Sequence, residues 1–189
     1  MKIIQIRGCH GVGKSTAVRQ FIEKHGLKET AVEVGGKKVP IQVSEEKDIV
    51  VLGRYNIQCG GCDLFHDKEQ VLSTIKKAIE VYRPEIIIFE GVMYGATKSF
   101  SMVAEKFAKK NGYAFVMIYL HDDFEKICRR IQLRNGGKDW NLQNTYSKFR
   151  GSAMSTDYLI KNGYDVRSFK TSEIEQAEMY KVIEGVAYE

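Results

Sequence analysis

The sequence has no apolar run that approaches the ~18 residues needed to cross a membrane, and its start lacks the pattern of a secretory signal peptide. It has two prolines and four cysteines in 189 residues, with no internal repeat and no linker-like stretch. So few cysteines in a chain of this length do not suggest a disulfide framework. These absences argue against a membrane-spanning or disulfide-stapled secreted protein. They predict one domain over residues 1–189 that acts in the cytoplasm.

A phosphate-binding loop stands near the start of the chain. Residues 2–7 form an apolar run typical of a buried strand, and an amphipathic helical pattern begins at about residue 14. Between them lies a full match to G-x-x-x-x-G-K-[ST]. Because a strand precedes the motif and a helix follows it, we interpret it as a nucleoside triphosphate site. The residues expected to contact the nucleotide are Gly8, His10, Gly11, Val12, Gly13, Lys14, Ser15 and Thr16.

The residue types in this loop suit phosphate chemistry. Its glycines allow successive backbone N–H groups to curl around a phosphate at φ values that a Cβ would penalise. Lys14 is expected to reach the β- and γ-phosphates and to act in catalysis, and the Ser15 hydroxyl is expected to bind Mg²⁺. ATP and Mg²⁺ are therefore the expected cofactors.

Apolar runs and helical patterns alternate along the rest of the chain. We expect strands over residues 48–52, 85–91, 114–120 and 165–169, and helices over 68–82, 99–110 and 142–160. The alternation predicts an α/β fold with a parallel sheet of about five strands and helices on both faces. Residues 30–44 alternate in polarity around Gly35 and Gly36, which predicts a β-hairpin inserted after the first helix.

Three pairs of residues have the spacing of helix N-terminal caps. Asp67 with Gln70 is expected to cap the helix over 68–82. Asp122 with Glu125, and Ser172 with Glu175, form capping-box patterns. The last of these predicts a C-terminal helix that runs to about residue 183.

The helix that follows residue 122 is basic. It carries Arg130 and Arg134 four residues apart, on one face, and Asn135–Lys138 end it. Arginines in this place can stabilise the charge that develops on a transferred phosphoryl group. We interpret residues 129–150, approximately, as a lid with Arg130 and Arg134 as catalytic residues. The alternative is an ordinary solvated face.

Two carboxylates are candidates for the chemistry. Glu90 ends the apolar strand 85–91, where an acid can hold Mg²⁺ directly or through water. Asp63 follows the strand 48–52 and is the candidate general base for a hydroxyl acceptor. The alternatives are a solvated strand-end carboxylate for Glu90 and a helix cap for Asp63.

The segment over residues 53–63 is rich in glycine, and we interpret it as a loop that contacts substrate. Arg54 could meet a phosphate, Tyr55 could stack on a base, and the backbone at Gly60 and Gly61 could press against the acceptor. A second hypothesis is a redox pair or half a zinc site made of Cys59, Cys62 and His66. Zinc would need a fourth ligand, and no second C-x-x-C occurs.

The order of these motifs resembles the P-loop nucleoside and nucleotide kinases over nearly the whole chain. The loop from Gly8 to Thr16, the strand that ends at Glu90 and the arginines after Leu120 are similar to that superfamily's Walker A, Walker B and lid. The resemblance implies a single-domain P-loop NTPase of the nucleoside monophosphate kinase type. It also implies that Asp63 matches the aspartate that serves as base in polynucleotide kinase-like relatives.

The segment from Gly53 to Asp63 and the short chain resemble, more narrowly, bacteriophage 5-hydroxymethyluracil DNA kinases. Those enzymes phosphorylate the hydroxymethyl group of a modified base in DNA. The resemblance implies modified DNA as a partner, a base that leaves the stack to be phosphorylated, and action in the host cytoplasm. The net charge of +5 permits a polyanionic partner of this kind.

The sequence therefore predicts an ATP-dependent kinase with a nucleotide-type acceptor, first the hydroxymethyl group of 5-hydroxymethyluracil in DNA. The alternative is a kinase whose acceptor is a free deoxynucleoside monophosphate or nucleoside. A P-loop switch that hydrolyses nucleotide without an acceptor, or a nucleotide-binding adaptor, is the alternative of another class. The sequence contains no N-K-x-D guanine-recognition motif, which argues against a GTP switch.

Overall fold

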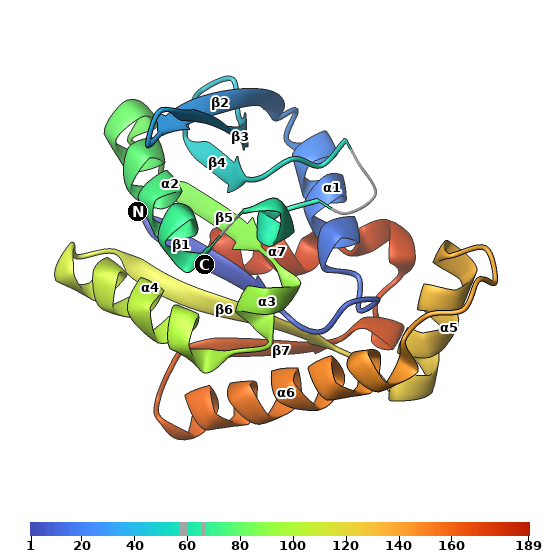
Figure 1. The fold of residues 1–189 in the computed structure, drawn as a ribbon. Helices are drawn as coiled ribbons and strands as arrows, with labels where there is room; N and C mark the ends of the chain where they lie inside the picture. The colour runs from blue at the N-terminus through green and yellow to red at the C-terminus, as the bar shows by residue number, and fades with distance from the viewer. Residues whose placement is uncertain (57–59, 66) are drawn as a thin grey trace.

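A computed structural model describes residues 1–56, 60–65 and 67–189, and these include a seven-stranded sheet in the order β2-β3-β4-β5-β1-β6-β7 (Figure 1). The strands are β1 (Lys2–Arg7), β2 (Lys28–Val34), β3 (Lys37–Val43), β4 (Ile49–Leu52), β5 (Ile86–Glu90), β6 (Ala114–His121) and β7 (Val166–Lys170). Five adjacent strands, in the sheet order β4-β5-β1-β6-β7, pair in parallel. The hairpin β2–β3 pairs antiparallel with β4, so the sheet has seven strands rather than five.

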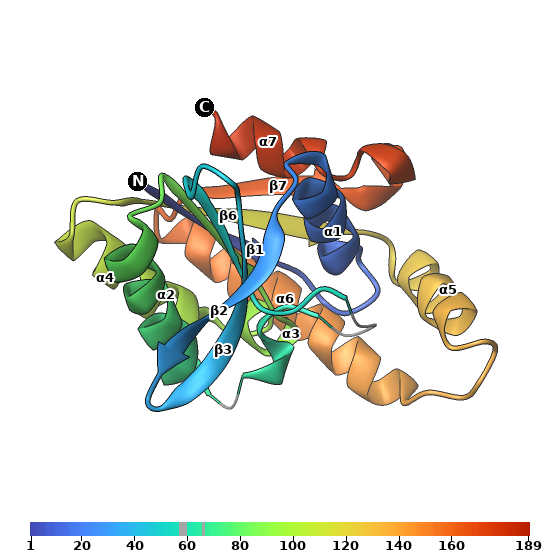
Figure 2. The same ribbon diagram turned by 90° about the horizontal axis from the view of Figure 1, so that it is seen from above.

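Helices cover both faces of the sheet, as Figure 2 shows from above. The helices are α1 (Lys14–Lys24), α2 (Lys68–Tyr82), α3 (Val92–Gly95), α4 (Lys98–Lys110), α5 (Phe124–Arg134), α6 (Leu142–Lys161) and α7 (Lys181–Ala187). Successive residues of a strand point to opposite faces. In β5, Ile86 and Ile88 pack with the apolar cluster of α1 and α7, while Ile87 and Phe89 pack with that of α2 and α4. Burial on both faces explains the continuous apolar run of such a strand.

Helix α2 has the predicted bounds. The Asp67 carboxylate accepts a hydrogen bond from the backbone N–H of Gln70 at 2.7 Å, so the predicted cap is confirmed. The prediction for Asp122 is wrong. Asp123 is the N-cap residue of α5, without a side-chain cap bond, because the buried Asp122 carboxylate is bound to Arg130 and Thr171 instead.

The predicted C-terminal helix from Ser172 is also wrong. Residues 171–178 contain two 3₁₀ turns, Thr171–Glu173 and Gln176–Glu178, and α7 begins only at Lys181. The Thr171 side chain donates to Asp122, and Met179 is buried in the core. These two anchors keep the segment against the body of the protein as an irregular wall.

The strand order brings several loops to one edge of the sheet. Strand β1 lies between β5 and β6, and the connections after all three begin at the same carboxyl edge. Ligands of open α/β sheets bind in the crevice at such a reversal of strand order. None of the helices in the described part of the chain is both long and apolar enough to span a membrane.

Candidate active site

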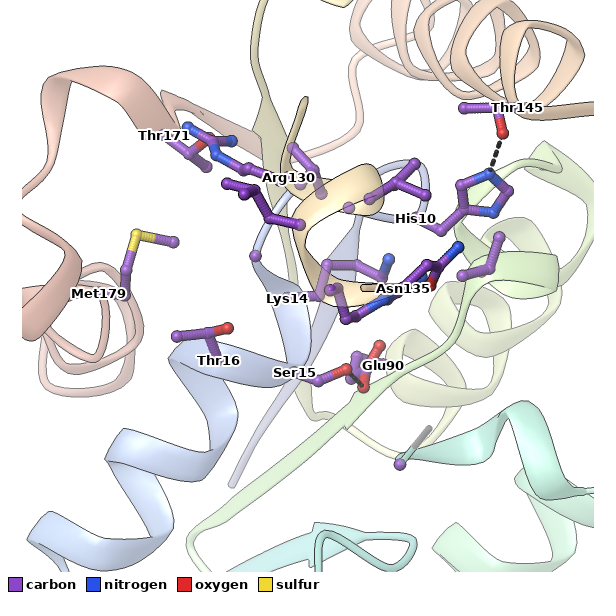
Figure 3. Close-up of a pocket in the computed structure, with 18 of the residues that line it drawn as sticks. His10, Lys14, Ser15, Thr16, Glu90, Arg130, Asn135, Thr145, Thr171 and Met179 are labelled. Carbon is purple, nitrogen blue, oxygen red and sulfur yellow. Dashed lines mark hydrogen bonds between the residues drawn. The ribbon is translucent and has the colours of Figure 1, made fainter. Parts of the chain in front are cut away.

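A cavity of about 980 Å³ opens at this edge of the sheet (Figure 3). Its walls come from the phosphate-binding loop, the segment between β4 and α2, the end of β5 with the start of α3, the helices α5 and α6, and the segment after β7. The predicted site residues that line it are His10, Gly11, Val12, Gly13, Lys14, Ser15, Thr16, Gly60, Asp63, Glu90, Arg130 and Arg134. The volume is at the upper end of the range for small-molecule pockets.

The loop before α1 has the backbone that the motif predicts. Gly8 has a φ of +136°, and a Cβ there would lie 2.4 Å from the carbonyl oxygen of Leu120. Only glycine fits this position. The Lys14 side chain is buried, and its Nζ donates a 3.0 Å hydrogen bond to the carbonyl of Cys9 in the same loop. The ammonium group is thus already held over the concave side of the loop.

Ser15 and Glu90 meet on the floor of the cavity, as Figure 3 shows. The Ser15 hydroxyl donates to Oε1 of Glu90 at 2.7 Å. Burial raises the pKa of Glu90, with a smaller contribution from Asp63, while Lys14, the Ser15 hydroxyl and Arg19 oppose the shift. A hydroxyl and a buried carboxylate form an all-oxygen set that suits Mg²⁺. Gly61 lies against this carboxylate, since a Cβ there would be 2.6 Å from Oε1 of Glu90.

Asp63 lies in the 3₁₀ turn Cys62–Leu64 and faces the first turn of α3. Its Oδ1 accepts a 2.7 Å hydrogen bond from the backbone N–H of Val92. The side chain is exposed to the cavity, and its second oxygen has no hydrogen-bond partner among the described residues. Asp63 therefore has one oxygen fixed by α3 and the other free for an acceptor. The alternative prediction, that Asp63 caps the helix following it, is wrong, because Asp67 caps α2 and Asp63 binds the first turn of α3 instead.

Arg130 is held in place by two side chains that the sequence did not identify as site residues. Its Nη2 donates to Oδ2 of Asp122 at 2.6 Å, and its Nη1 donates to Oγ1 of Thr171 at 2.9 Å. Burial would raise the pKa of Asp122, but hydrogen bonds from the Asp123 N–H, Ser172, Thr171 and Arg130 lower it to about 2. Arg134, one turn further along α5, is exposed at the cavity wall.

We predict that Asp122→Asn loses part of the orientation of Arg130, with a fall in kcat of about tenfold, and about 2 kcal/mol of stability at pH 7. The folded-state pKa lies below the ordinary 3.8, so the ionised form stabilises the fold. This stability is complete above pH 3.8 and is lost as the pH falls through 2. Urea unfolding at pH 7 and near pH 2 measures the free energy of unfolding of the variant and of the natural protein. We expect the difference between the two to be smaller near pH 2 than at pH 7. An unchanged kcat would contradict the orienting role.

His10 connects the phosphate-binding loop to α6. Its Nε2 lies 3.0 Å from Oγ1 of Thr145, and that hydroxyl donates to the Asn141 carbonyl at 3.1 Å. The Thr145 oxygen is then the acceptor, so Nε2 carries the imidazole proton. Burial lowers the pKa of His10, and the positive charges of Lys14, Lys148 and Arg134 lower it further. A neutral His10 adds no charge beside Lys14.

Arg7, at the end of β1, is fully buried. Its guanidinium donates to the carbonyls of Tyr94 at 3.3 Å and Thr97 at 3.2 Å, to the Ser101 hydroxyl, and to the Ser155 hydroxyl at 2.8 Å. Burial lowers its pKa to about 10. None of the described carboxylates forms an ion pair with it. Arg7 thus ties the residues after β5 to α6 directly beside the phosphate-binding loop.

Some predicted residues do not reach the cavity. Tyr55 is 6% exposed and packs in the core, and Arg54 is exposed and forms a 3.4 Å ion pair with Glu29. Neither is among the residues that line the cavity. The backbone bridge between Arg54 and Gly61 turns this segment back on itself and fixes Gly61 beside Glu90.

The metal or redox hypothesis falls mostly outside the described residues. Cys59 and His66 lie in the undescribed positions, while Cys62 is buried with a free thiol. Burial raises the pKa of that thiol well above its usual value, and Glu90 and Asp63 act in the same direction. Among the described residues, no group of three metal-ligating side chains occurs.

Several cavity residues were missed by the sequence reasoning. They are Arg19, Thr171, Ser172 and Met179. Asn135, Asn141 and Asn144 also line the cavity and fall within the predicted lid, residues 129–150. Asp122 carried a usable signal, because it follows the carboxyl end of β6 as Glu90 ends β5. The segment after β7 carried none, since contacts with distant residues, Thr171 with Asp122 and Met179 with the core, bring it to the cavity.

Comparison with known proteins identifies the family. Residues 1–159 match the family model of the 5-hmdU (5-hydroxymethyldeoxyuridine) DNA kinases. The 5-hmdU DNA kinase of Pseudomonas phage M6 is 30% identical over 177 residues, which cover 88% of this chain and 90% of the relative. That of Pseudomonas phage PaMx11 is 25% identical over 174 residues, covering 87% and 88%.

Solved structures agree on the fold. The YorR protein of Bacillus subtilis, in complex with phosphorylated GDP, has a TM-score of 0.59 at 14% identity over 98% of this chain and 95% of its own. Deoxyadenosine kinase from M. mycoides with bound dCTP has a TM-score of 0.50 at 16% identity over 100% and 99%. At these identities the likeness concerns the fold alone. The match over most of the sequence and the shared α/β fold make this chain a phosphotransferase that belongs to the 5-hmdU DNA kinase family.

Proposed function

We propose that this protein transfers the γ-phosphoryl group of ATP to the hydroxymethyl group of 5-hydroxymethyluracil in DNA, in the cytoplasm of the host cell. One observation carries the proposal. A single cavity is lined by the phosphate-binding loop, the Ser15–Glu90 pair and the carboxylate of Asp63, one oxygen of which has no partner among the described residues. This is the arrangement that a kinase for a hydroxyl acceptor needs.

The residues divide the work between the two substrates. The loop N–H groups and Lys14 would bind the triphosphate, and Arg130 and Arg134 would stabilise charge on the transferred group from the α5 side. Residues 129–150, approximately, would act as the lid. Asp63 would accept the proton of the acceptor hydroxyl, while Gly60 and Val92 form the wall beside it. The Ser15–Glu90 pair would hold Mg²⁺, which supplies charge neutralisation at the β- and γ-phosphates when bound.

The reacting groups must be in line and shielded from water. The hydrogen bond between His10 and Thr145 joins the phosphate-binding loop to α6 in the cavity wall, which supports an enclosed site on this side. The arrangement does not by itself choose between a base in DNA and a free nucleotide. Membership of the family favours DNA.

The test is label transfer from γ-³²P-ATP with Mg²⁺. Acceptors are a DNA oligonucleotide with one 5-hydroxymethyluracil, the same oligonucleotide with thymine, and a mixture of deoxynucleoside monophosphates. We expect label in the first alone, and none with Lys14→Ala. Label in the monophosphates alone would replace the proposal by a nucleotide kinase. Phosphate release without a labelled acceptor would indicate a switch-type NTPase.

A further inference from the structure

The short helix α3 carries an exposed methionine beside the cavity. Met93 is 57% exposed, whereas its neighbour Tyr94 is 2% exposed. Val92, on its other side, lines the cavity and is bound by Asp63. A large apolar side chain directed to solvent at the rim of an active site lacks a packing explanation within the protein.

Helix α3 is a firm support for this side chain. The Tyr94 hydroxyl donates to the Asp67 carbonyl at 3.1 Å, and the Tyr94 carbonyl accepts from the buried Arg7. The Tyr94 ring lies 5.0 Å from that of Phe100, centroid to centroid. Met93 is therefore a flexible side chain on a fixed backbone, which is the form of a residue that fills a variable gap.

Two lysines lie at the starts of α2 and α4, the helices that precede and follow α3 in the chain. The Thr97 hydroxyl donates to the Met93 carbonyl at 3.3 Å, and Lys98 follows it in the chain. Lys68 donates to the Ser99 hydroxyl at 2.7 Å, which brings the start of α2 to the start of α4. Both lysines are exposed, and neither forms an ion pair with a described carboxylate. The Lys98 ammonium lies 3.4 Å from the centre of the Tyr158 ring of α6, a contact that leaves its charge without a counter-ion. Both positive charges are thus available to an anionic partner.

Helix α6 forms the neighbouring wall of the cavity. Asn141 and Asn144 line the cavity, and Lys148 is one turn further on. The same face of α6 then reaches Gly151, where a Cβ would lie 3.6 Å from the Ala96 carbonyl, next to α3. Figures 1 and 2 both show α3 beside the middle of α6. Val92 of α3 and Asn144 of α6 thus lie in neighbouring walls of the cavity, and the exposed Met93 directly follows Val92.

We propose that the DNA strand crosses the protein over α3, with Met93 inserted into the gap that the extruded base leaves in the stack. Lys68 and Lys98 contact phosphates beside that gap. Apolar side chains, methionine among them, serve as wedges between base steps in proteins that distort DNA. A base that must reach Asp63 inside the cavity has to leave the duplex, and filling its place lowers the cost. The inference rests on the proposed function and identifies the surface that duplex DNA occupies.

The test compares one modified base in two settings. The acceptor is an oligonucleotide with one 5-hydroxymethyluracil, used as a duplex and as the single strand, and kcat/KM is measured for both. We expect Met93→Ala to lower kcat/KM on the duplex by about tenfold and on the single strand by less than about twofold, since only the duplex requires extrusion. The matched control is Val103→Ala, a 51% exposed apolar residue on α4 outside the cavity lining, which should change neither.

The role of the two lysines is tested by the dependence of kcat/KM on salt concentration. The double variant Lys68→Gln/Lys98→Gln should reduce the slope of log(kcat/KM) against log salt by about two on the duplex, one for each lost phosphate contact. An equal loss on both DNA forms with Met93→Ala, or no loss on either, would overturn the wedge. An unchanged salt slope would overturn the path over α3. If the natural protein labels the single strand but no duplex, this inference fails and the proposed function stands. If it labels neither form, both fail.

Discussion

Asp63→Asn should retain binding of ATP and of the modified DNA but lower kcat by about 10²–10⁴-fold, the usual contribution of a general base. The substitution is conservative in structure, because the asparagine oxygen can still accept the hydrogen bond from the Val92 N–H that Asp63 accepts at 2.7 Å. What it removes is the charge and basicity of the second oxygen. Single-turnover label transfer at saturating substrates measures the effect directly.

The same substitution four residues on is the control. Asp67 caps α2 through its side chain, and asparagine is an equally good N-cap, so Asp67→Asn should change neither stability nor kcat. Full activity in Asp63→Asn would contradict the base role and leave Asp63 with its contact to α3 alone. A loss that appears in KM rather than kcat would instead indicate a role in binding the acceptor.

Glu90→Gln should separate stability from activity. Burial raises the pKa of Glu90, so at pH 7 its charged form opposes folding. The neutral isostere can still accept from the Ser15 hydroxyl, and we expect it to raise the Tm in the absence of Mg²⁺. Because folding raises this pKa above its ordinary 4.5, the gain is present at neutral pH and disappears as the pH falls below that value.

The kinase activity of Glu90→Gln should fall by about 10²-fold or more, since one ligand for the expected Mg²⁺ is weakened. Two measurements check this pair of effects: thermal unfolding in EDTA at pH 7 and pH 4, and kcat over a Mg²⁺ titration. Ser15→Ala is a useful comparison, because it removes the hydroxyl but leaves the buried carboxylate without its 2.7 Å donor and should lower the Tm. A Tm for Glu90→Gln below that of the natural protein would contradict the argument from burial.

Local patterns predicted much of the fold. The bounds of α2 could be predicted because its apolar periodicity and its Asp67 cap are both encoded within one stretch of chain. The parallel strands were predicted for the same reason, since two covered faces give continuous apolar runs. The phosphate-binding loop needed only its motif and its place between β1 and α1.

Contacts between distant segments were not predictable in this way. Asp122 has the spacing of a helix cap, but its carboxylate accepts a hydrogen bond from Thr171, which lies 49 residues away in the sequence. Tyr55 looked like a base-stacking residue because it adjoins a glycine-rich loop, yet its ring is buried. The seven-stranded sheet follows from the pairing of β3 with β4, which is a tertiary contact and has no signature in the hairpin itself.

The buried Arg7 anchors one part of α6 to the body of the protein. The C-terminal half is anchored, because Ser155 accepts a hydrogen bond from Arg7 and Leu159 is in the core. Pulling this half away would leave a buried guanidinium with fewer partners, at a cost of about 1–3 kcal/mol for each buried group left unsatisfied. The N-terminal half meets the phosphate-binding loop at Thr145, and Gly151 lies between the two halves. We therefore expect closure of the proposed lid to hinge within α6 near Gly151, so that nucleotide binding moves Asn141 and Asn144 while Ser155 and Leu159 stay in place.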